Sequence, residues 1–181
     1  MSITHAQSRG LLALLFAGLV GTPPTLATPE FVEHIPGNAV YGETGVTMRD
    51  PVAPAAGATI NVWVRIGYSF YYTDVAVYYT TDGSTPQGSF GTPSGGTAVL
   101  TFTGGQISFI RNEPHDPNID WWRATLPPAC SVAGVTVKYK LGAWHSGGGP
   151  EVFANNYGCA DGTCDNPSAP ATVFEYTVTG S

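Results

Sequence analysis

The chain has 181 residues, a formal net charge of −6 at pH 7, and charged side chains at only 11% of its positions. Phosphate binding requires clustered basic side chains, and seven Lys and Arg residues are outnumbered here by 13 Asp and Glu residues, so the composition argues against a nucleic-acid partner. The 23 Gly, 15 Pro and 12% aromatic residues are typical of an all-β extracellular module.

Residues 1–27 are predicted to be a cleavable signal peptide. Arg9 precedes an apolar run at residues 11–20, and Thr25 and Ala27 supply small side chains where a peptidase would cut. The run is shorter than the ~20 residues that cross a bilayer, which favours export over membrane anchoring. We therefore expect a secreted or cell-surface protein that begins near Thr28, with no stable membrane insertion after cleavage. The remaining length, about 150 residues, suits one domain.

Residues 28–56 are predicted to form an extended leader with at most one edge strand around residues 40–48, because Pro and Gly recur there. The folded domain is predicted to occupy residues 57–181. Its first strand alternates with a period of two, which places Asn61, Trp63 and Arg65 on one face. The opposite, core-directed face carries Ile60, Val62, Val64 and Ile66.

About six further strands follow from similar alternation. They are expected near residues 75–81, 97–103, 106–111, 120–126, 135–143 and 172–178. A hairpin is predicted between the second and third of these across Gly104-Gly105, with a polar loop at 112–118 and a long loop at 145–170. Residues 135–143 carry the longest apolar stripe and are expected to form a central strand. No helical pattern of useful length appears outside the signal peptide.

The three cysteines suggest one disulfide in an oxidising compartment. Cys159 and Cys164 flank a short turn and are the expected pair, which leaves Cys130 either buried or available for an intermolecular bond. No second pair of Cys or His has the spacing of a zinc site. A weaker alternative is calcium bound in the same loop, without EF-hand spacing, by Asn155, Asn156, Asp161 and Asp165. No cofactor is expected.

Several motifs together resemble a known group of modules. Residues 78–86 (YYTTDGSTP) look like the strand and turn of the small C-terminal β-domain associated with chitobiase and β-hexosaminidase. Residues 122–127 (WRATLP), 137–140 (VKYK) and 143–144 (AW) are similar to the immunoglobulin-like E-set modules that accompany secreted glycoside hydrolases, including the N-terminal sandwich of α-amylase-like enzymes. This resemblance implies an immunoglobulin-like antiparallel β-sandwich of about seven strands and a non-catalytic accessory role.

An immunoglobulin-type strand order would pair the Trp63 strand with the strand that holds Trp121 and Arg123. Both indoles could then share an outward face on which a sugar ring stacks, while Arg123 or Asn61 binds its hydroxyl groups. Two alternatives are that the leader or residues 104–119 cover these rings, or that they dock against a neighbouring domain or subunit.

The favoured function is therefore a secreted accessory module that contacts carbohydrate or supports a carbohydrate-active enzyme domain. The alternative is a structural surface or matrix protein that assembles through an edge strand or through Cys130. A small glycoside hydrolase is the weakest interpretation, because it needs two carboxyl groups across a cleft. The available acids lie in or beside predicted loops without a recognisable catalytic frame, and they are Glu113, Asp116, Asp120 and Glu151.

Overall fold

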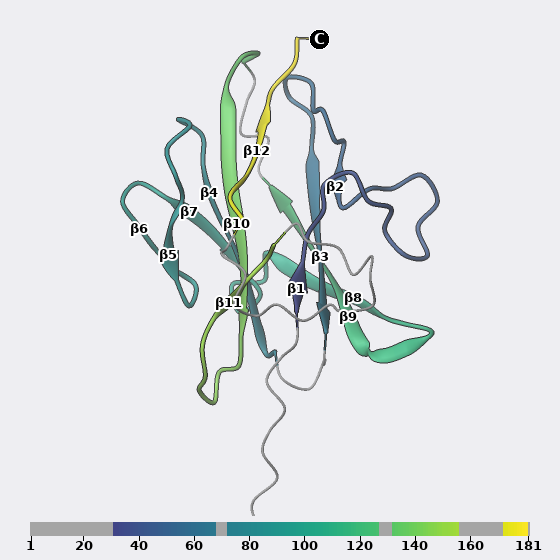
Figure 1. The fold of residues 1–181 in the computed structure, drawn as a ribbon. Coiled ribbons are helices and arrows are strands. Elements are labelled where there is room, and N and C mark those ends of the chain that lie inside the picture. Colours follow the sequence, from purple (N-terminus) through teal and green to yellow (C-terminus); the bar gives the residue numbers. More distant parts are fainter. Residues whose placement is uncertain (1–30, 68–71, 127–131, 156–171, 181) are drawn as a thin grey trace, which may run out of the picture.

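A computed structural model describes residues 31–67, 72–126, 132–155 and 172–180. These residues form an all-β structure in which every pair of neighbouring strands is antiparallel. Figure 1 shows two main groups of strands, one on each side of a shared interior. Within the described ranges no helix is long and apolar enough to cross a membrane.

The first sheet has five strands in the order β1-β3-β9-β8, with β2 also paired to β3. Its strands are β1 (Val32–Glu33), β2 (Arg49–Asp50), β3 (Ile60–Gly67), β8 (Ile107–Glu113) and β9 (Asp116–Leu126). The register of β3 and β9 places Trp63 opposite Arg123 and Arg65 opposite Trp121, so the predicted pairing of these two segments is confirmed.

The second sheet also has five strands, in the order β11-β10-β4-β7, with β12 paired to β10. Its strands are β4 (Asp74–Thr80), β7 (Ala98–Thr101), β10 (Thr136–Trp144), β11 (Val152–Phe153) and β12 (Phe174–Thr177). Because β10 pairs with β4 along one edge and with β11 and β12 along the other, its predicted central position is confirmed. A separate two-stranded hairpin joins β5 (Gln87–Ser89) to β6 (Thr92–Ser94).

One apolar core fills the space between the two sheets. The alternating face of β3 supplies its predicted four residues, and β4, β9, β10 and β12 supply theirs in the same way. Residues of this core include Ile60, Val62, Val64, Ile66, Val75, Val77, Trp122, Ala124, Leu126, Val137, Tyr139, Leu141, Ala143, Phe174 and Tyr176. The period-two pattern in the sequence therefore identified the buried face of each of these strands.

Three predicted connections are wrong. Residues 97–103 and 106–111 do not form a hairpin, because β7 pairs with β4 in the second sheet and β8 pairs with β9 in the first. The chain crosses between sheets at Gly104-Gly105, a turn whose composition suits either connection. The predicted polar loop at 112–118 is mostly strand, since β8 ends at Glu113 and β9 begins at Asp116. The predicted loop at 145–170 contains β11.

The leader contributes more strand than its sequence predicts. Its segment β1 pairs with β3 beside Arg65, β2 pairs with β3 beside Asn61, and an isolated bridge joins Ala39 to Thr47. Thus the single edge strand expected around residues 40–48 is replaced by two short strands and a bridge. Both short strands pair with the edge of β3 opposite β9, and the residues between them pack on Trp63 and Trp121.

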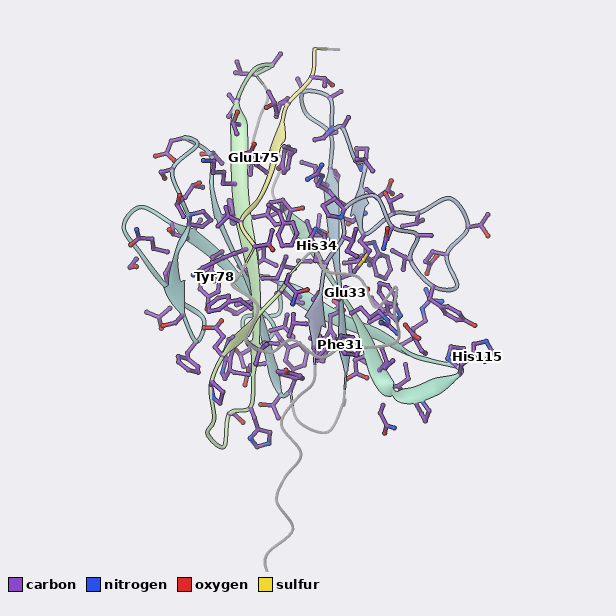
Figure 2. The ribbon with its side chains drawn as sticks, in the orientation of Figure 1. Phe31, Glu33, His34, Tyr78, His115 and Glu175 are labelled. Carbon is purple, nitrogen blue, oxygen red and sulfur yellow. The ribbon has the colours of Figure 1, made fainter. Side chains whose placement is uncertain are left out.

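His34 connects the leader to both sheets (Figure 2) and is fully buried. Its Nδ1 lies 2.6 Å from the carbonyl oxygen of Trp63, and its Nε2 lies 2.8 Å from the hydroxyl of Tyr139. Burial lowers the pKa of His34 to about 3, so the ring is neutral. A carbonyl oxygen can only accept, so Nδ1 carries the proton and Nε2 accepts from Tyr139.

Arg49 completes this buried network. Its Nη1 donates to the Tyr139 hydroxyl at 3.3 Å and to the Glu175 carbonyl at 2.9 Å, while Nε and Nη2 donate to the Val52 carbonyl. Tyr139 thereby donates to one leader residue and accepts from another. The leader is therefore tied to β3, β10 and β12 by hydrogen bonds from two of its own side chains.

The buried His34 predicts how stability depends on pH. Its pKa is about 3 in the folded protein and ordinarily 6.5, so between these values the unfolded chain binds more protons. The free energy of unfolding should therefore decrease as pH falls from 7 to 4. Urea denaturation of the wild type and of His34→Gln at both pH values tests this, and the variant should show the smaller decrease.

The two proteins share every other titrating group, including Asp120, so the difference between them isolates His34. An equal decrease in both proteins contradicts the prediction. So does a His34 ring that titrates near pH 6.5 in the folded wild type, as followed by its NMR chemical shifts.

Candidate functional site

Trp63 and Trp121 lie on the same side of the first sheet, as predicted, but they are not open to a ligand. Each side chain is only 3% exposed, and both pack in a cluster with Val40 and Met48 of the leader. The leader thus covers these rings, which was one of the two alternatives to a sugar platform. A flat aromatic surface for a sugar ring is not present at these two residues, because side chains of the leader already occupy it.

The other two predicted contact residues lie beside the covered rings. The guanidinium carbon of Arg123 is 5.4 Å from the centre of the Trp63 ring, which is a cation–π distance. Asn61 accepts a hydrogen bond from the Thr125 hydroxyl at 2.9 Å. Both side chains are therefore engaged with their neighbours on β3 and β9.

The expected disulfide and most of the calcium alternative lie outside the described residues. The residues concerned are Cys159, Cys164, Cys130, Asn156, Asp161 and Asp165. Asn155 is described, and its backbone is hydrogen-bonded to Val32 and to His34 of the leader. Across the described part of the chain, no group of three or more His, Cys, Asp or Glu residues is placed to hold a metal ion.

A pocket of about 370 Å³ opens beside Trp121, between the leader and the outer side of the first sheet. This volume falls in the range of small-ligand sites. We call it the Tyr41 pocket, and it is lined by Glu33, Asn38, Ala39, Tyr41, Met48, Arg65, Glu113 and Trp121. Of these residues only Trp121 was predicted as a contact residue, because five of the others belong to the leader, whose pairing with β3 was not expected.

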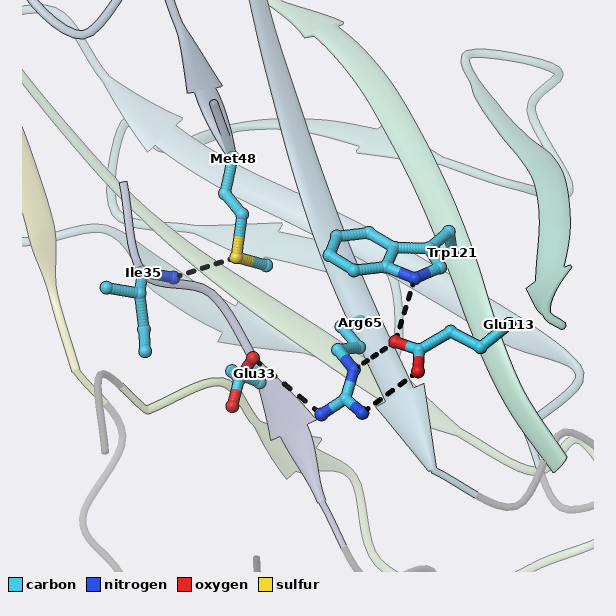
Figure 3. A network of polar contacts seen from close by, with 6 residues as sticks. All are labelled: Glu33, Ile35, Met48, Arg65, Glu113 and Trp121. Carbon is cyan, nitrogen blue, oxygen red and sulfur yellow. Dashed lines mark hydrogen bonds and ion pairs between the residues drawn. The ribbon is translucent and has the colours of Figure 1, made fainter. Parts of the chain in front are cut away.

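Arg65 organises the polar wall of the pocket (Figure 3). Its Nε donates to Oε1 of Glu113 at 2.5 Å and its Nη2 to Oε2 at 3.3 Å, a two-pronged ion pair. Its Nη1 lies 3.9 Å from Oε1 of Glu33. The Trp121 indole N–H donates to Oε1 of Glu113 at 3.0 Å. Two-pronged pairs of this kind fix both orientation and distance, so these polar groups are held in place before any ligand arrives.

Tyr41 is the aromatic ring of this pocket that solvent reaches most readily. It is 38% exposed, whereas the side chains of Arg65, Glu33 and Glu113 are 17%, 10% and 13% exposed. The centres of its ring and of the His115 ring are 5.8 Å apart in an edge-to-face arrangement. The pocket therefore combines one accessible ring with recessed charged groups.

A larger depression of about 600 Å³ lies at one end of the second sheet, lined by polar residues that include Asp82, Lys138 and Glu175. Lys138 and Glu175 are 4.0 Å apart and exposed to screening by solvent. Among the described residues that line this depression there is no aromatic ring, so these residues offer no surface on which a ring-shaped ligand could stack.

A second cluster of ionisable groups fastens the β5–β6 hairpin to the second sheet. The Tyr78 hydroxyl donates to Glu151 at 2.8 Å, and the backbone N–H of Phe90 donates to the other oxygen of Glu151 at 2.6 Å. The N–H of Gly91 donates to the Tyr78 hydroxyl at 2.7 Å. Two side chains of the sheet region thus hold the tip of the hairpin by its backbone.

Lys140 adds a third attachment, because its Nζ donates to the carbonyl of Gly88 at 2.9 Å. Desolvation raises the pKa of Glu151 and lowers the pKa of Lys140. Opposite shifts of this kind occur at catalytic sites, but these groups are hydrogen-bonded to the hairpin backbone. The arrangement therefore favours a structural role.

Two of the remaining acids are also held by neighbours. Glu113 is paired with Arg65, and Asp120 is buried and accepts from the Asn112 side chain at 2.5 Å. Burial raises the pKa of Asp120 to about 6. The side chain of Asp116 lies outside the described part of the chain. Of the candidate acids whose side chains are described, only Glu113 lines the Tyr41 pocket.

Gly142 leaves the space through which Glu151 reaches Tyr78, since a Cβ there would collide with the Glu151 carboxylate. Gly142→Ala should displace Glu151, loosen the hairpin tip and destabilise the protein by about 1–3 kcal/mol. Hydrogen exchange measured by NMR should then be faster at the amides of Phe90 and Gly91. Gly37→Ala is the control, because open space surrounds that position, and unchanged exchange in Gly142→Ala contradicts the prediction.

No protein-family model matches the chain, and no curated protein matches its sequence. The function is therefore inferred from the pocket, its charges and its exposed ring.

Proposed function

We propose that this protein is a secreted, non-catalytic module that binds carbohydrate in the Tyr41 pocket. The observation that carries the proposal is the exposed ring of Tyr41 beside the fixed Arg65–Glu113–Trp121 network. A sugar has an apolar ring face that packs on an aromatic side chain, and hydroxyl groups that need polar partners in fixed directions. The pocket offers both kinds of contact within one small volume.

The polar groups are suited to hydroxyl ligands because they are already ordered. Glu113 receives two hydrogen bonds from Arg65 and one from Trp121, so its carboxylate does not have to reorient on binding. Pre-organised groups lose less conformational entropy when a ligand arrives. Asn38 adds an amide that can both donate and accept. Trp121 is buried, so it holds Glu113 in place through its indole N–H and does not form the stacking surface.

Secretion and the accessory role form the rest of the proposal. They are supported by the export-like residues 1–27 and by the resemblance of residues 122–127 and 137–140 to immunoglobulin-like E-set modules of secreted glycoside hydrolases. The two antiparallel sheets are compatible with such a module, although many unrelated functions share this architecture. The partner would be a polysaccharide or a carbohydrate-active enzyme domain.

Assembly through an edge strand is the second candidate function. Strand β8 ends the first sheet, and the exposed rings of Phe109 on β8 and of Phe102 each make an edge-to-face contact with Trp122. An exposed edge with aromatic side chains can pair with another chain. However, the register of β8 shifts between Phe109 and Arg111, and such bulges interrupt edge pairing. Carbohydrate binding is therefore favoured.

The proposal predicts that Tyr41→Ala weakens retention on a polysaccharide. Residues 28–181 would be mixed with starch, chitin, cellulose and xylan, and binding isotherms measured. Loss of one stacking contact, about 1.4 kcal/mol, corresponds to roughly tenfold weaker binding to the polymer that the wild type retains. Phe109→Ala is the matched control, because it removes an exposed aromatic ring that does not line the pocket.

Two results would contradict this function. One is that a folded wild type is retained by none of the polymers, and the other is that Tyr41→Ala binds as tightly as the wild type. Sedimentation of the same samples tests the second candidate, which requires a concentration-dependent oligomer that Phe109→Ala disrupts.

A further inference from the structure

The leader is attached to the first sheet by short strands. Strands β1 and β2 have two residues each, whereas β3 pairs with β9 along its whole length, Ile60–Gly67. Several backbone hydrogen bonds of residues 35–49 stay within that segment, including those from Val40 to Val46 and from Met48 to Asn38. A segment that is bonded internally and pairs only briefly with its neighbours can open as a unit while the core stays folded.

The face that the leader covers contains an unsatisfied donor. Trp63 and Trp121 are each 3% exposed, in the cluster that they form with Val40 and Met48. The indole N–H of Trp63 is buried and has no hydrogen-bond partner among the described residues. Burying a donor without a partner is costly, and water would supply the partner in an opened state. Opening of the leader therefore relieves one local cost of the closed structure.

The closed position requires a neutral ring at His34. Its Nδ1–H donates to the Trp63 carbonyl, and its Nε2 accepts from the Tyr139 hydroxyl, which itself accepts from Nη1 of Arg49. An imidazolium has a donor on both nitrogens. Protonation would therefore aim two cationic N–H groups at one buried hydroxyl oxygen and leave the Tyr139 proton without its acceptor.

The groups that face His34 oppose a positive charge on it. Among its described contacts, Arg49 on β2 is the charged group, and burial together with this guanidinium lowers the pKa of His34. Tyr139 on β10 is the other titratable group, and burial raises its pKa to about 12, so it stays protonated. The ring of Phe174 on β12 packs edge-on at 4.6 Å. The proton is therefore bound far more readily when His34 reaches water.

We propose that residues 31–50 form an acid-released cover: protonation of His34 detaches them from both sheets and exposes the face formed by Trp63 and Trp121, while the core between the sheets stays folded. This inference does not depend on the carbohydrate function. In the opened state the two indoles form an apolar surface that is accessible to a partner. The Tyr41 pocket is lost at the same time, because five of its lining residues leave with the leader.

Hydrogen exchange measured by NMR on residues 28–181 at pH 7 and pH 5 tests the inference. The reporters are the amides of Trp63 and Gly67, which donate to the leader carbonyls of Met48 and Phe31. Because opening binds one proton at His34, the opened fraction should rise about 25-fold from pH 7 to pH 5. The protection factors of both reporters, which correct for the direct effect of pH on exchange, should fall by the same factor.

The level of protection separates local opening from global unfolding. Global unfolding also frees His34, so the amides of β10 are expected to lose protection as pH falls. At both pH values, however, the reporters should be at least about tenfold less protected than the amides in the centre of β10, because the cover opens more often than the whole protein unfolds.

Two variants assign the pH response. In His34→Gln the side-chain amide can still donate to Trp63 and accept from Tyr139, but it does not titrate, so the reporters should change by less than about threefold. His115→Gln is the matched control, because it removes an exposed imidazole that lies against Tyr41 of the leader. This control should keep the full response of the wild type.

Other acid-sensitive groups do not confuse this comparison. The ion pairs Glu43–Arg111 and Glu33–Arg65 also hold the leader, and carboxylates ordinarily titrate near pH 4, below the range used. Asp120, whose pKa is about 6, titrates within the range but is present in all three proteins.

Three results would overturn the inference. The first is equal protection of the reporters and of β10, which means that the leader leaves only when the whole protein unfolds. The second is an unchanged protection of the reporters between pH 7 and pH 5. Both are read from the wild type alone, so they decide the question even if His34→Gln does not fold. The third is a full response in His34→Gln or its loss in His115→Gln. No saccharide enters these measurements, so their outcome is separate from that of the Tyr41→Ala binding assay.

Discussion

The arrangement of the two sheets depends on a neutral imidazole buried between them. His34 joins the carbonyl of Trp63 on β3 to the hydroxyl of Tyr139 on β10, and Arg49 bonds the same hydroxyl from its other side. Each of these polar atoms would otherwise be buried without a partner, which is costly in an apolar interior. Because both His34 and Arg49 belong to the leader, this segment is as much a part of the fold as the strands it contacts.

The same placement of the leader explains the outer side of the first sheet. Once β1 and β2 pair with β3, the intervening chain must cross the faces of Trp63 and Trp121. The pairing of the leader with β3 therefore both buries the two Trp rings and forms the Tyr41 pocket. The leader covers the Trp63–Trp121 face, and its residues Glu33, Asn38 and Tyr41 form a large part of the Tyr41 pocket.

The alternation of apolar and polar residues in the sequence predicted which face of each long strand is buried. Alternation in residues 60–66 and 135–143 identified the core face of β3 and β10, since burial on one side of a strand imposes a period of two. The crossing at Gly104-Gly105 could not be predicted in this way, because two glycines fit a hairpin and a crossover equally well. The Tyr41 pocket was missed because its residues come from three distant segments. The alternation of apolar residues at Val40, Val46 and Met48 was the available signal that the leader has a buried face.

Because the leader covers Trp63 and Trp121, the folded protein needs the leader and the later strands in one chain. A recombinant fragment that began at Gly57, where the sequence first suggests a domain, would lack β1, β2, His34 and Arg49. Both indoles would then face water, and the carbonyl of Trp63 and the hydroxyl of Tyr139 would lose their partners inside the core. Such a fragment would be prone to aggregate through its exposed apolar rings. Binding measured with it would involve surfaces that the leader covers in the intact chain.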